Sequence, residues 1–279
     1  MFPHPFFIFH FRRRKDAVRF GIHDFLNAQP LLVPLKRRAA DAGLEIVTDV
    51  PSALADRLKS GELDVALIPS VEYLRAGGQY DLIPAMCIAS RGPVGTVLLF
   101  SRVPLEQVRS IALDRRSRTS VALMHLLFAG HLKPGVSLHT ASPDPQAMLR
   151  DHDAGLLIGD PALGWSPPEG VRVHDLSEEW FRLTRCTFVH AVVCAGTKVP
   201  GDAPIRQVLD EAREEGLKQI DGIAADCARR DGREPGLYLD YLKHRIRYRF
   251  GAEEREGLIR FRDLCLHHRL IPNAFDLEF

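Results

Sequence analysis

The sequence GELDVALIPSVEYLRAGG, residues 61–78, contains one complete strand-and-helix unit. The run DVALI, residues 64–68, is typical of a buried strand. Pro69 and Ser70 then open a short helix, and the pair Gly77-Gly78 ends it. A strand followed at once by a helix is the repeating unit of folds in which helices cover a mostly parallel sheet.

The same alternation continues on both sides of this unit. Strands are predicted over residues 18–22, 44–47, 82–88, 94–101, 111–113, 136–139, 154–158 and 187–194. Helices are predicted over residues 51–59, 117–128 and 144–150, and from Ile205 to the end of the chain. Residues 27–40 are predicted to be a loop that enters a helix, with Pro30 and Pro34 delaying the start of that helix. The chain therefore belongs to the α/β class, with a largely parallel sheet expected.

Two long apolar strands, residues 94–101 and 187–194, bracket a self-contained α/β unit. We therefore expect two lobes and two crossovers between them. Residues 18–97 and 190–279 would form lobe 1, and residues 98–189 would form lobe 2. A ligand of such a chain is expected in the cleft, where strand ends and helix N-termini of both lobes converge.

The first residues are expected to lie outside both lobes. Residues 1–17 read as a disordered extension, in which an aromatic run precedes a positive cluster. This order is the reverse of a secretory signal.

The five cysteines lie far apart with no CxxC pair, which favours a reducing cytoplasmic compartment. No apolar run approaches the ~18 residues of a membrane helix, so no membrane partner is expected.

Composition narrows the function classes. With 46% hydrophobic and 26% charged residues, the 279-residue chain has enough apolar material for packed cores, which excludes a disordered or fibrous chain. Its 37 basic and 36 acidic residues nearly cancel, so bulk charge gives no support for a nucleic-acid partner. The sequence has no P-loop, G-x-G-x-x-G, G-x-S-x-G or H-E-x-x-H motif, so neither a nucleotide cofactor nor a zinc site is expected.

Three hydroxyls and a guanidinium gather after one predicted strand. Ser117, Arg118, Thr119 and Ser120 stand at the start of a predicted helix. Free N–H groups and short donors at a helix N-terminus suit a carboxylate or a phosphate. Ser117 alone is more simply an N-cap, but three consecutive donors favour an anion site.

Two further segments occupy similar positions. In SRGPVGT, Ser90 and Arg91 precede Gly92, which allows close approach of a ligand, and Thr96 offers a hydroxyl; a plain glycine turn is the alternative. Asn27 in FLNAQP follows the first predicted strand, where Asn is either a helix cap or a ligand contact. The pair Gly159-Asp160 follows a strand in the second lobe.

Seven segments together resemble one family. They are FLNAQP, GELDVALIPSVEYL, SRGPVGTVLLFS, ALDRRSRTSVALMHLL, LLIGDPAL, DLSEEW and YLKHRIRYRFGAEEREGLIRF. In this order, from Val18 to Ile271, they are similar to the chorismate dehydratases of the futalosine route to menaquinone. The resemblance implies a two-lobe, type II periplasmic-binding-protein-like α/β fold with a central ligand cleft. It also implies a cytoplasmic hydro-lyase that works without a metal or other cofactor.

The family reaction removes water from chorismate and gives 3-[(1-carboxyvinyl)oxy]benzoate. By resemblance, the substrate's own enolpyruvyl carboxylate takes the ring proton, and the protein contributes orientation and electrostatics. Asn27 would hold the reacting part, and Thr96 would stand where the family often has Ser. These two are the candidate catalytic residues.

The other candidates are substrate-binding residues. Ser117, Thr119 and Ser120 would anchor carboxylates, and Ser70, Gly159 and Asp160 would line the cleft. The candidate set is completed by Ser90, Arg91, Gly92 and Arg118. The expected partner is the small molecule chorismate, and a homo-oligomer stays open.

One segment departs from the family pattern. TRCTFVHAVV, residues 184–193, has Arg185 and Cys186 where the family has Gly-Leu, and His190 where it has an aromatic residue. Three functions other than a dehydratase stay open. They are a non-catalytic small-anion (solute) binding protein of the same fold, the effector domain of a transcriptional regulator, and a small-molecule-binding subunit that has lost activity. A solute-binding protein would carry a signal peptide or lipobox, and a regulator a helix-turn-helix before Val18; neither pattern is recognised here.

Overall fold

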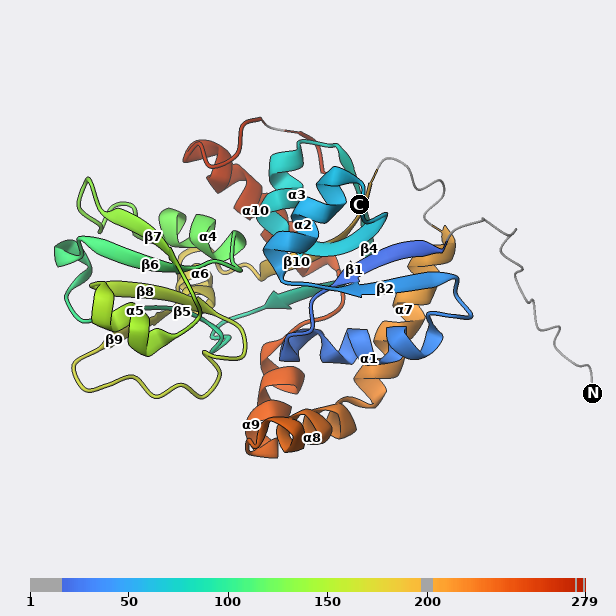
Figure 1. Ribbon diagram of the computed structural model, residues 1–279. Coiled ribbons are helices and arrows are strands. Elements are labelled where there is room, and N and C mark those ends of the chain that lie inside the picture. Colours follow the sequence, from blue (N-terminus) through green and yellow to red (C-terminus); the bar gives the residue numbers. More distant parts are fainter. Residues whose placement is uncertain (1–16, 197–202, 274, 278) are drawn as a thin grey trace, which may run out of the picture.

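The computed structural model describes residues 17–196, 203–273, 275–277 and 279. Each of the two lobes is built on a five-stranded sheet, and the lobes stand side by side in Figure 1. The extension predicted for residues 1–17 lies outside the described residues, except for Ala17.

Lobe 1 holds the sheet with strand order β2-β1-β3-β10-β4. Its strands are β1 (Val18–Ile22), β2 (Leu44–Thr48), β3 (Val65–Pro69), β4 (Tyr80–Ser90) and β10 (Phe188–Gly196). Its helical elements are η1 (Leu26–Ala28), α1 (Gln29–Arg38), α2 (Pro51–Ser60), α3 (Ser70–Ala76), α7 (Ala203–Lys218), α8 (Ile220–Asp231), α9 (Pro235–Asp240), the π-helix η3 (Tyr241–Arg245) and α10 (Ala252–His267). Helices α2, α3 and α10 cover one face, and α1 and α7 the other (Figure 1).

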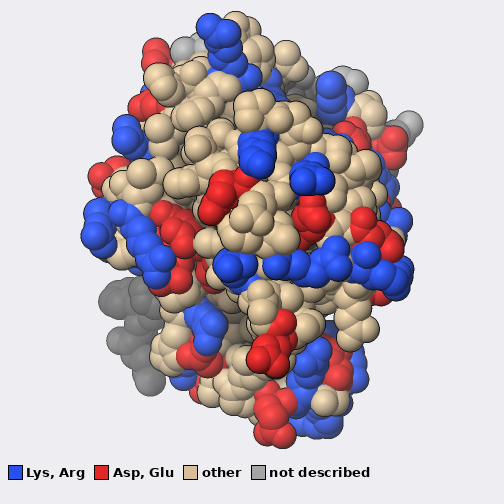
Figure 2. Space-filling model, turned by 90° about the vertical axis from the view of Figure 1, so that its left-hand side faces the viewer, with Lys and Arg blue, Asp and Glu red and all other residues tan. Residues whose placement is uncertain are grey.

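Lobe 2 repeats this arrangement with the order β7-β6-β8-β5-β9. Its strands are β5 (Val97–Ser101), β6 (Ser110–Asp114), β7 (Ser137–Ala141), β8 (Ala154–Ile158) and β9 (Arg172–Asp175). Its helical elements are η2 (Leu105–Gln107), α4 (Thr119–Phe128), α5 (Pro145–Asp151) and α6 (Leu176–Thr184). Figure 2 shows basic and acidic side chains interspersed over the face of this lobe that is turned to the viewer.

Both sheets are mixed, where the sequence predicts largely parallel ones. β1 pairs in parallel with β2 and β3, but β10 is antiparallel to β3 and β4. In the same way β6 is parallel to β7 and β8, whereas β5 is antiparallel to β8 and β9. The reason is that β5 and β10 enter their sheets from the other lobe. They begin at the edge where the parallel strands end.

The crossovers fall close to the predicted boundaries. β5 begins at Val97, already in the sheet of lobe 2, and β10 begins at Phe188, already in the sheet of lobe 1. The division into 18–97 plus 190–279 and 98–189 stays our proposal, supported by these sheet memberships. The sequence analysis did not predict β9, whose four residues are not buried.

Local sequence signals explain several helix ends. Helix α2 has Pro51 in its first turn and ends at Gly61, whose left-handed φ of 77° suits glycine. The Asp144 side chain accepts the N–H groups of Gln146 and Ala147 and so caps α5. Pro34 lies inside α1 and does not delay it as predicted; η1 occupies the preceding turn.

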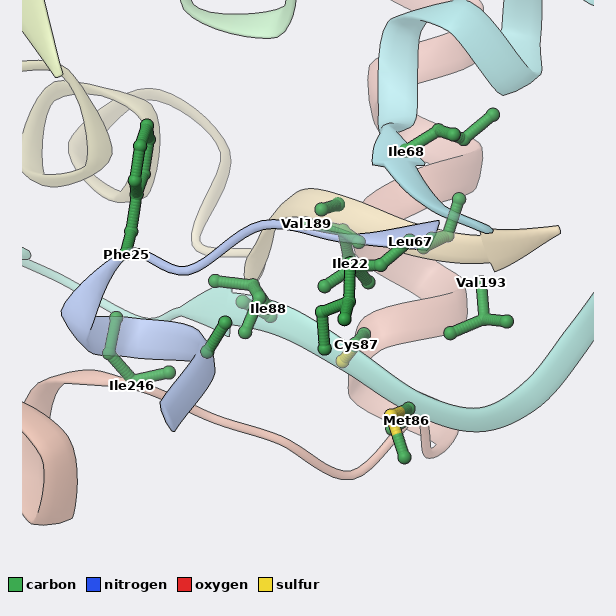
Figure 3. Close-up of a cluster of buried hydrophobic side chains, with 14 of the residues drawn as sticks. Ile22, Phe25, Leu67, Ile68, Met86, Cys87, Ile88, Val189, Val193 and Ile246 are labelled. Carbon is green, nitrogen blue, oxygen red and sulfur yellow. The ribbon is translucent and has the colours of Figure 1, made fainter. Parts of the chain in front are cut away.

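A large apolar cluster extends through lobe 1 to the cleft. Figure 3 shows its part around Ile22, Leu67 and Val193, with Ile88 and Ile246 beside the segment that carries Phe25. Helix α10 packs so closely against the residue before β10 that a Cβ atom at Gly257 would overlap the carbonyl of Thr187. Among the described residues, no helix has the length and apolar character needed to span a membrane.

Candidate functional site

A cavity lies between the two lobes and encloses about 570 Å³, including space open to solvent. Lobe 1 and the crossover before β5 contribute His23, Phe25, Asn27, Pro51, Pro69, Ile88, Val94, Thr96, His190, Ala191 and Ile246. Lobe 2 contributes Val97, Arg116, Ser117, Arg118, Thr119, Ser120, Ile158 and Gly159. The ends of β1, β3 and β8 and the starts of β5 and α4 therefore meet here, as the sequence predicts for a cleft ligand.

Asn27 lies in the short helix η1, just after β1. Its position is set from the other lobe, because both carboxylate oxygens of Asp160 accept the N–H of Leu26, at 3.0 and 3.1 Å. The Oδ1 atom of Asn27 is buried and has no hydrogen-bond partner among the described residues. Asn27 is thus held in place while its amide oxygen stays available.

Thr96 is buried in the crossover before β5. Its Oγ1 lies 2.8 Å from the hydroxyl of Tyr241, which is fully buried at the start of η3. Burial raises the pKa of Tyr241, and hydrogen bonds from Thr96 and Asn27 partly oppose this. The two candidate catalytic residues therefore share one buried tyrosine, which the sequence analysis did not single out.

Gly159 lines the cavity next to Thr96. Its N–H donates to the carbonyl of Thr96 at 2.9 Å, and its φ of +72° lies in the left-handed region. A Cβ atom there would stand 3.1 Å from the Phe25 ring. Glycine is thus required on two counts, backbone conformation and space.

The hydroxyl cluster begins α4. Ser117 lines the cavity, and its Oγ accepts the N–H of Ser120 at 3.3 Å. The N-cap of α4 is Arg118, one residue later than the sequence predicts. Thr119 Oγ1 accepts the N–H of Val71 in α3 at 3.3 Å, which ties the two lobes together and leaves the hydroxyl hydrogen free to donate. The positive end of α4 and these hydroxyls form a wall suited to an anion.

Two guanidinium groups complete this wall. Arg118 pairs with Asp56 and Glu72 of lobe 1 at 2.7 and 3.3 Å. Arg116, which the sequence analysis did not select, binds the buried Asp114 through Nε and Nη2 at 2.9 and 2.6 Å. Its Nη1 has no hydrogen-bond partner within the described part of the chain, so this edge is available to a ligand.

Two neutral imidazoles stand on the lobe 1 side. Burial lowers the pKa of His23 and of His190 to about 4. The Nε2 atom of His190 lies 2.9 Å from Ser90 Oγ and 3.4 Å from Ser177 Oγ. His23 is 3% exposed, and its Nδ1 atom is buried without a hydrogen-bond partner among the described residues. His190 is one of the departures noted in the sequence, whereas His23 was missed.

Five sequence candidates do not line the cavity. The Ser70 hydroxyl donates to the Val189 carbonyl at 2.7 Å, and Ser90 reaches the cavity only through His190. Arg91 pairs with Glu253 at 3.0 Å on the surface. The other two are Gly92, at φ +87°, and Asp160, bound to Leu26 as described above.

The described part of the cavity wall is formed without acidic side chains. None of the described residues that line it is Asp or Glu. Over the described ranges, no group of three or more His, Cys, Asp or Glu residues is placed to hold a metal ion. The polar chemistry of the wall therefore comes from hydroxyls, guanidiniums, an amide and neutral imidazoles.

Solved structures similar to this chain show the fold. An Archaeoglobus fulgidus protein superposes with a TM-score of 0.78 at 14% identity, over 93% of this chain and all of that one. The periplasmic aliphatic sulphonate binding protein of Escherichia coli superposes with a TM-score of 0.63 at 18% identity, over 92% and 94% of the two chains. The expected two-lobe periplasmic-binding-protein-like fold is confirmed.

Sequence comparisons show the family. Residues 18–267 match a family model described as menaquinone biosynthesis. A curated Thermus thermophilus protein named chorismate dehydratase is 32% identical over an alignment of 265 residues, which covers 86% of this chain and 92% of that relative. The resemblance expected from the seven motifs is confirmed, and the chain belongs to this menaquinone biosynthesis family.

Proposed function

We propose that this protein is a chorismate dehydratase, a hydro-lyase that converts chorismate to 3-[(1-carboxyvinyl)oxy]benzoate and water. The name of the Thermus relative supports the activity. The observation that carries the proposal is the interlobe cavity, whose lobe 2 wall is cationic and rich in hydroxyls and whose opposite wall is neutral. Such a cavity suits an anion with an uncharged, reactive ring.

The carboxylates of the substrate meet the lobe 2 wall. Thr119 and Ser120 stand in the first turn of α4, where free N–H groups and the helix dipole favour negative charge. The free Nη1 edge of Arg116 adds a charge-assisted donor. Because Asp114 already binds the other edge, the guanidinium is held rigidly for this contact.

The reacting ring lies toward Asn27 and Thr96. The elimination takes a proton from the ring carbon that bears the ether and releases hydroxide from its neighbour, and aromatisation drives it forward. The described cavity wall supplies no carboxylate base, and burial makes its imidazoles weak bases. As the family resemblance implies, the enolpyruvyl carboxylate of the substrate itself takes the proton, and the protein contributes orientation and electrostatic stabilisation.

The protein acts in the cytoplasm in this proposal. All five cysteines are free in the structure, and four of them are buried. Unpaired cysteines are the usual state in a reducing compartment.

The test is direct. Purified protein treated with a chelator is mixed with chorismate, and the aromatic product is followed by ultraviolet absorbance and by mass spectrometry. Loss of one water from the substrate is expected. Unchanged chorismate together with a ligand-induced rise in Tm would favour the small-anion binding protein instead.

Asn27→Ala tests the assignment of the reacting end. We expect turnover to be nearly abolished while the far-ultraviolet circular dichroism spectrum is unchanged. Asn273→Ala is the matched control, because Asn273 is the other asparagine of the chain and is exposed. Near wild-type turnover of Asn27→Ala would remove this residue from the reaction.

A further inference from the structure

Two buried polar atoms of the β1–α1 connection have no hydrogen-bond partner in the described part of the chain. His23 and Asn27 lie on either side of Phe25, and both line the cavity. The Nδ1 atom of His23 and the Oδ1 atom of Asn27 are buried without a hydrogen bond to any described residue. Buried polar atoms are nearly always paired, so two unpaired ones in the same cavity wall indicate a ligand that pairs with them.

The chemistry of these atoms limits the ligand group. The amide oxygen of Asn27 only accepts hydrogen bonds, so the ligand must donate to it. A carboxylate cannot donate, whereas a hydroxyl both donates and accepts. His23 carries one N–H and one lone pair, because burial lowers its pKa to about 4 and the ring is neutral at pH 7. An amide oxygen and an imidazole N–H together match one hydroxyl group.

We propose that His23 and Asn27 together bind the substrate hydroxyl that leaves as water. The inference rests on the proposed function, in which chorismate carries a single hydroxyl on its ring. Asn27 Oδ1 accepts the hydroxyl hydrogen, and the ring N–H of His23 donates to the hydroxyl oxygen. His23 thereby becomes a catalytic residue that contacts the leaving group.

The donor acts where negative charge develops. As the ring C–H bond breaks, its electron pair forms the new ring double bond, and the C–O electron pair departs with the oxygen. The His23 N–H stabilises this oxygen. The proton that completes the water comes from the substrate carboxylic acid, which has just received it from the ring carbon. Substrate atoms thus balance as product plus one water.

The experiment compares His23→Phe with His23→Gln. Phe keeps an aromatic ring but removes both nitrogens, and Gln keeps an N–H donor. We expect His23→Phe to lower kcat about 10²-fold, as for loss of one donor to a transition-state oxygen, with a much smaller change in KM. His23→Gln is expected to recover part of this loss. His125→Phe is the control, since His125 is half-buried in α4 and does not line the cavity.

Inhibition by the product separates chemistry from shape. The product lacks the hydroxyl, so its inhibition constant is expected to change less than twofold in His23→Phe. A rise of this constant in parallel with the loss of kcat/KM would overturn the proposal, because His23 would then only shape the cavity. Equal turnover of His23→Phe and wild type would overturn it as well.

Failure of the proposed function gives a different result. If the wild-type protein binds chorismate without turnover, calorimetry measures chorismate affinity for wild type and His23→Phe. A loss of affinity in the variant supports hydroxyl recognition by His23, and equal affinities overturn it. Circular dichroism shows whether His23→Phe folds. If it does not, the same measurements are made on His23→Gln and His23→Asn. The Asn variant is expected to be less active than the Gln variant, because the Asn side chain is shorter and places its amide farther from the substrate.

Discussion

Asp160 accepts the backbone N–H of Leu26 with both of its carboxylate oxygens, at 3.0 and 3.1 Å. Asp160 follows β8 of lobe 2, and Leu26 begins the short helix η1 of lobe 1. The next residue is Asn27, whose side chain lines the cavity. One carboxylate therefore joins the lobes at the point where the candidate catalytic amide is positioned.

Asp160→Ala is expected to reduce turnover although the Asp160 side chain does not line the cavity. Removal of the carboxylate frees the Leu26 N–H and lets η1 shift, and small misplacements of reacting groups cost up to about 10²-fold in rate. We expect a fall of kcat of at least about tenfold, measured in the chorismate assay. Asp151→Ala is the control, since Asp151 is an exposed partner of Arg150 in α5. Unchanged kcat in Asp160→Ala would show that η1 needs no support from lobe 2.

The ionisation of Asp160 is expected to make the free energy of unfolding depend on pH. Burial raises the pKa of Asp160 to about 6, and the Leu26 N–H opposes this only in part. Since the unfolded pKa is about 3.9, the contribution of this group is fully present below pH 4 and is lost as pH rises through 6. Relative to Asp160→Asn, the wild type should gain roughly 1 kcal/mol of unfolding free energy between pH 7.5 and pH 5.

Urea unfolding of both proteins at the two pH values measures this difference. Because all other titrating groups are shared, they cancel in the comparison between wild type and Asp160→Asn. An unchanged or opposite difference between the two proteins would mean that Asp160 ionises normally.

Local patterns predicted much of the fold and a part of the cavity wall. The strand over 154–158, the helix that ends at Gly61 and the Asp144 cap follow from periodicity and cap chemistry, which act within a few residues. Asn27 and the Ser117–Ser120 cluster were predicted because they sit next to strand ends. Their common cavity was expected from the topology.

The rest depends on contacts between distant segments. Tyr241 reaches Thr96 across 145 residues, and Ser90 reaches His190 across 100. Arg116 could not be separated from its arginine neighbours in the sequence, because only the buried Asp114 selects it. No local pattern shows which of twelve histidines, His23 among them, faces a cavity.

The two buried imidazoles predict acid sensitivity. Their folded pKa values of about 4 lie below the unfolded value of 6.5, because burial disfavours the charged rings. The stability that this provides is fully present above pH 6.5 and is lost as pH falls through 4. Each ring should account for about 2 kcal/mol of lost stability between pH 7 and pH 4.5.

His190→Phe and His23→Phe are each expected to remove about 2 kcal/mol of the stability that is lost between pH 7 and pH 4.5. Urea unfolding at pH 7 and pH 4.5 gives the loss for wild type and for each variant. His267→Phe is the control, because His267 is exposed at the end of α10 and does not line the cavity. A variant that loses as much stability as the wild type would show that its imidazole titrates normally in the folded protein.

Thr96→Val tests the buried hydroxyl pair. Valine keeps the shape of threonine but leaves the Tyr241 hydroxyl without its 2.8 Å partner, in a region where both side chains are buried. A buried polar group that loses its partner costs about 1–3 kcal/mol, so the unfolding free energy should fall by that amount. Turnover should fall too, because Tyr241 also contacts Asn27. Thr96→Ser keeps the hydroxyl and should restore both quantities, while Thr140→Val on the exposed strand β7 should change neither. If Thr96→Val matches the wild type in stability and rate, the hydroxyl pair does not support the site, and Asn27 alone positions the reacting end.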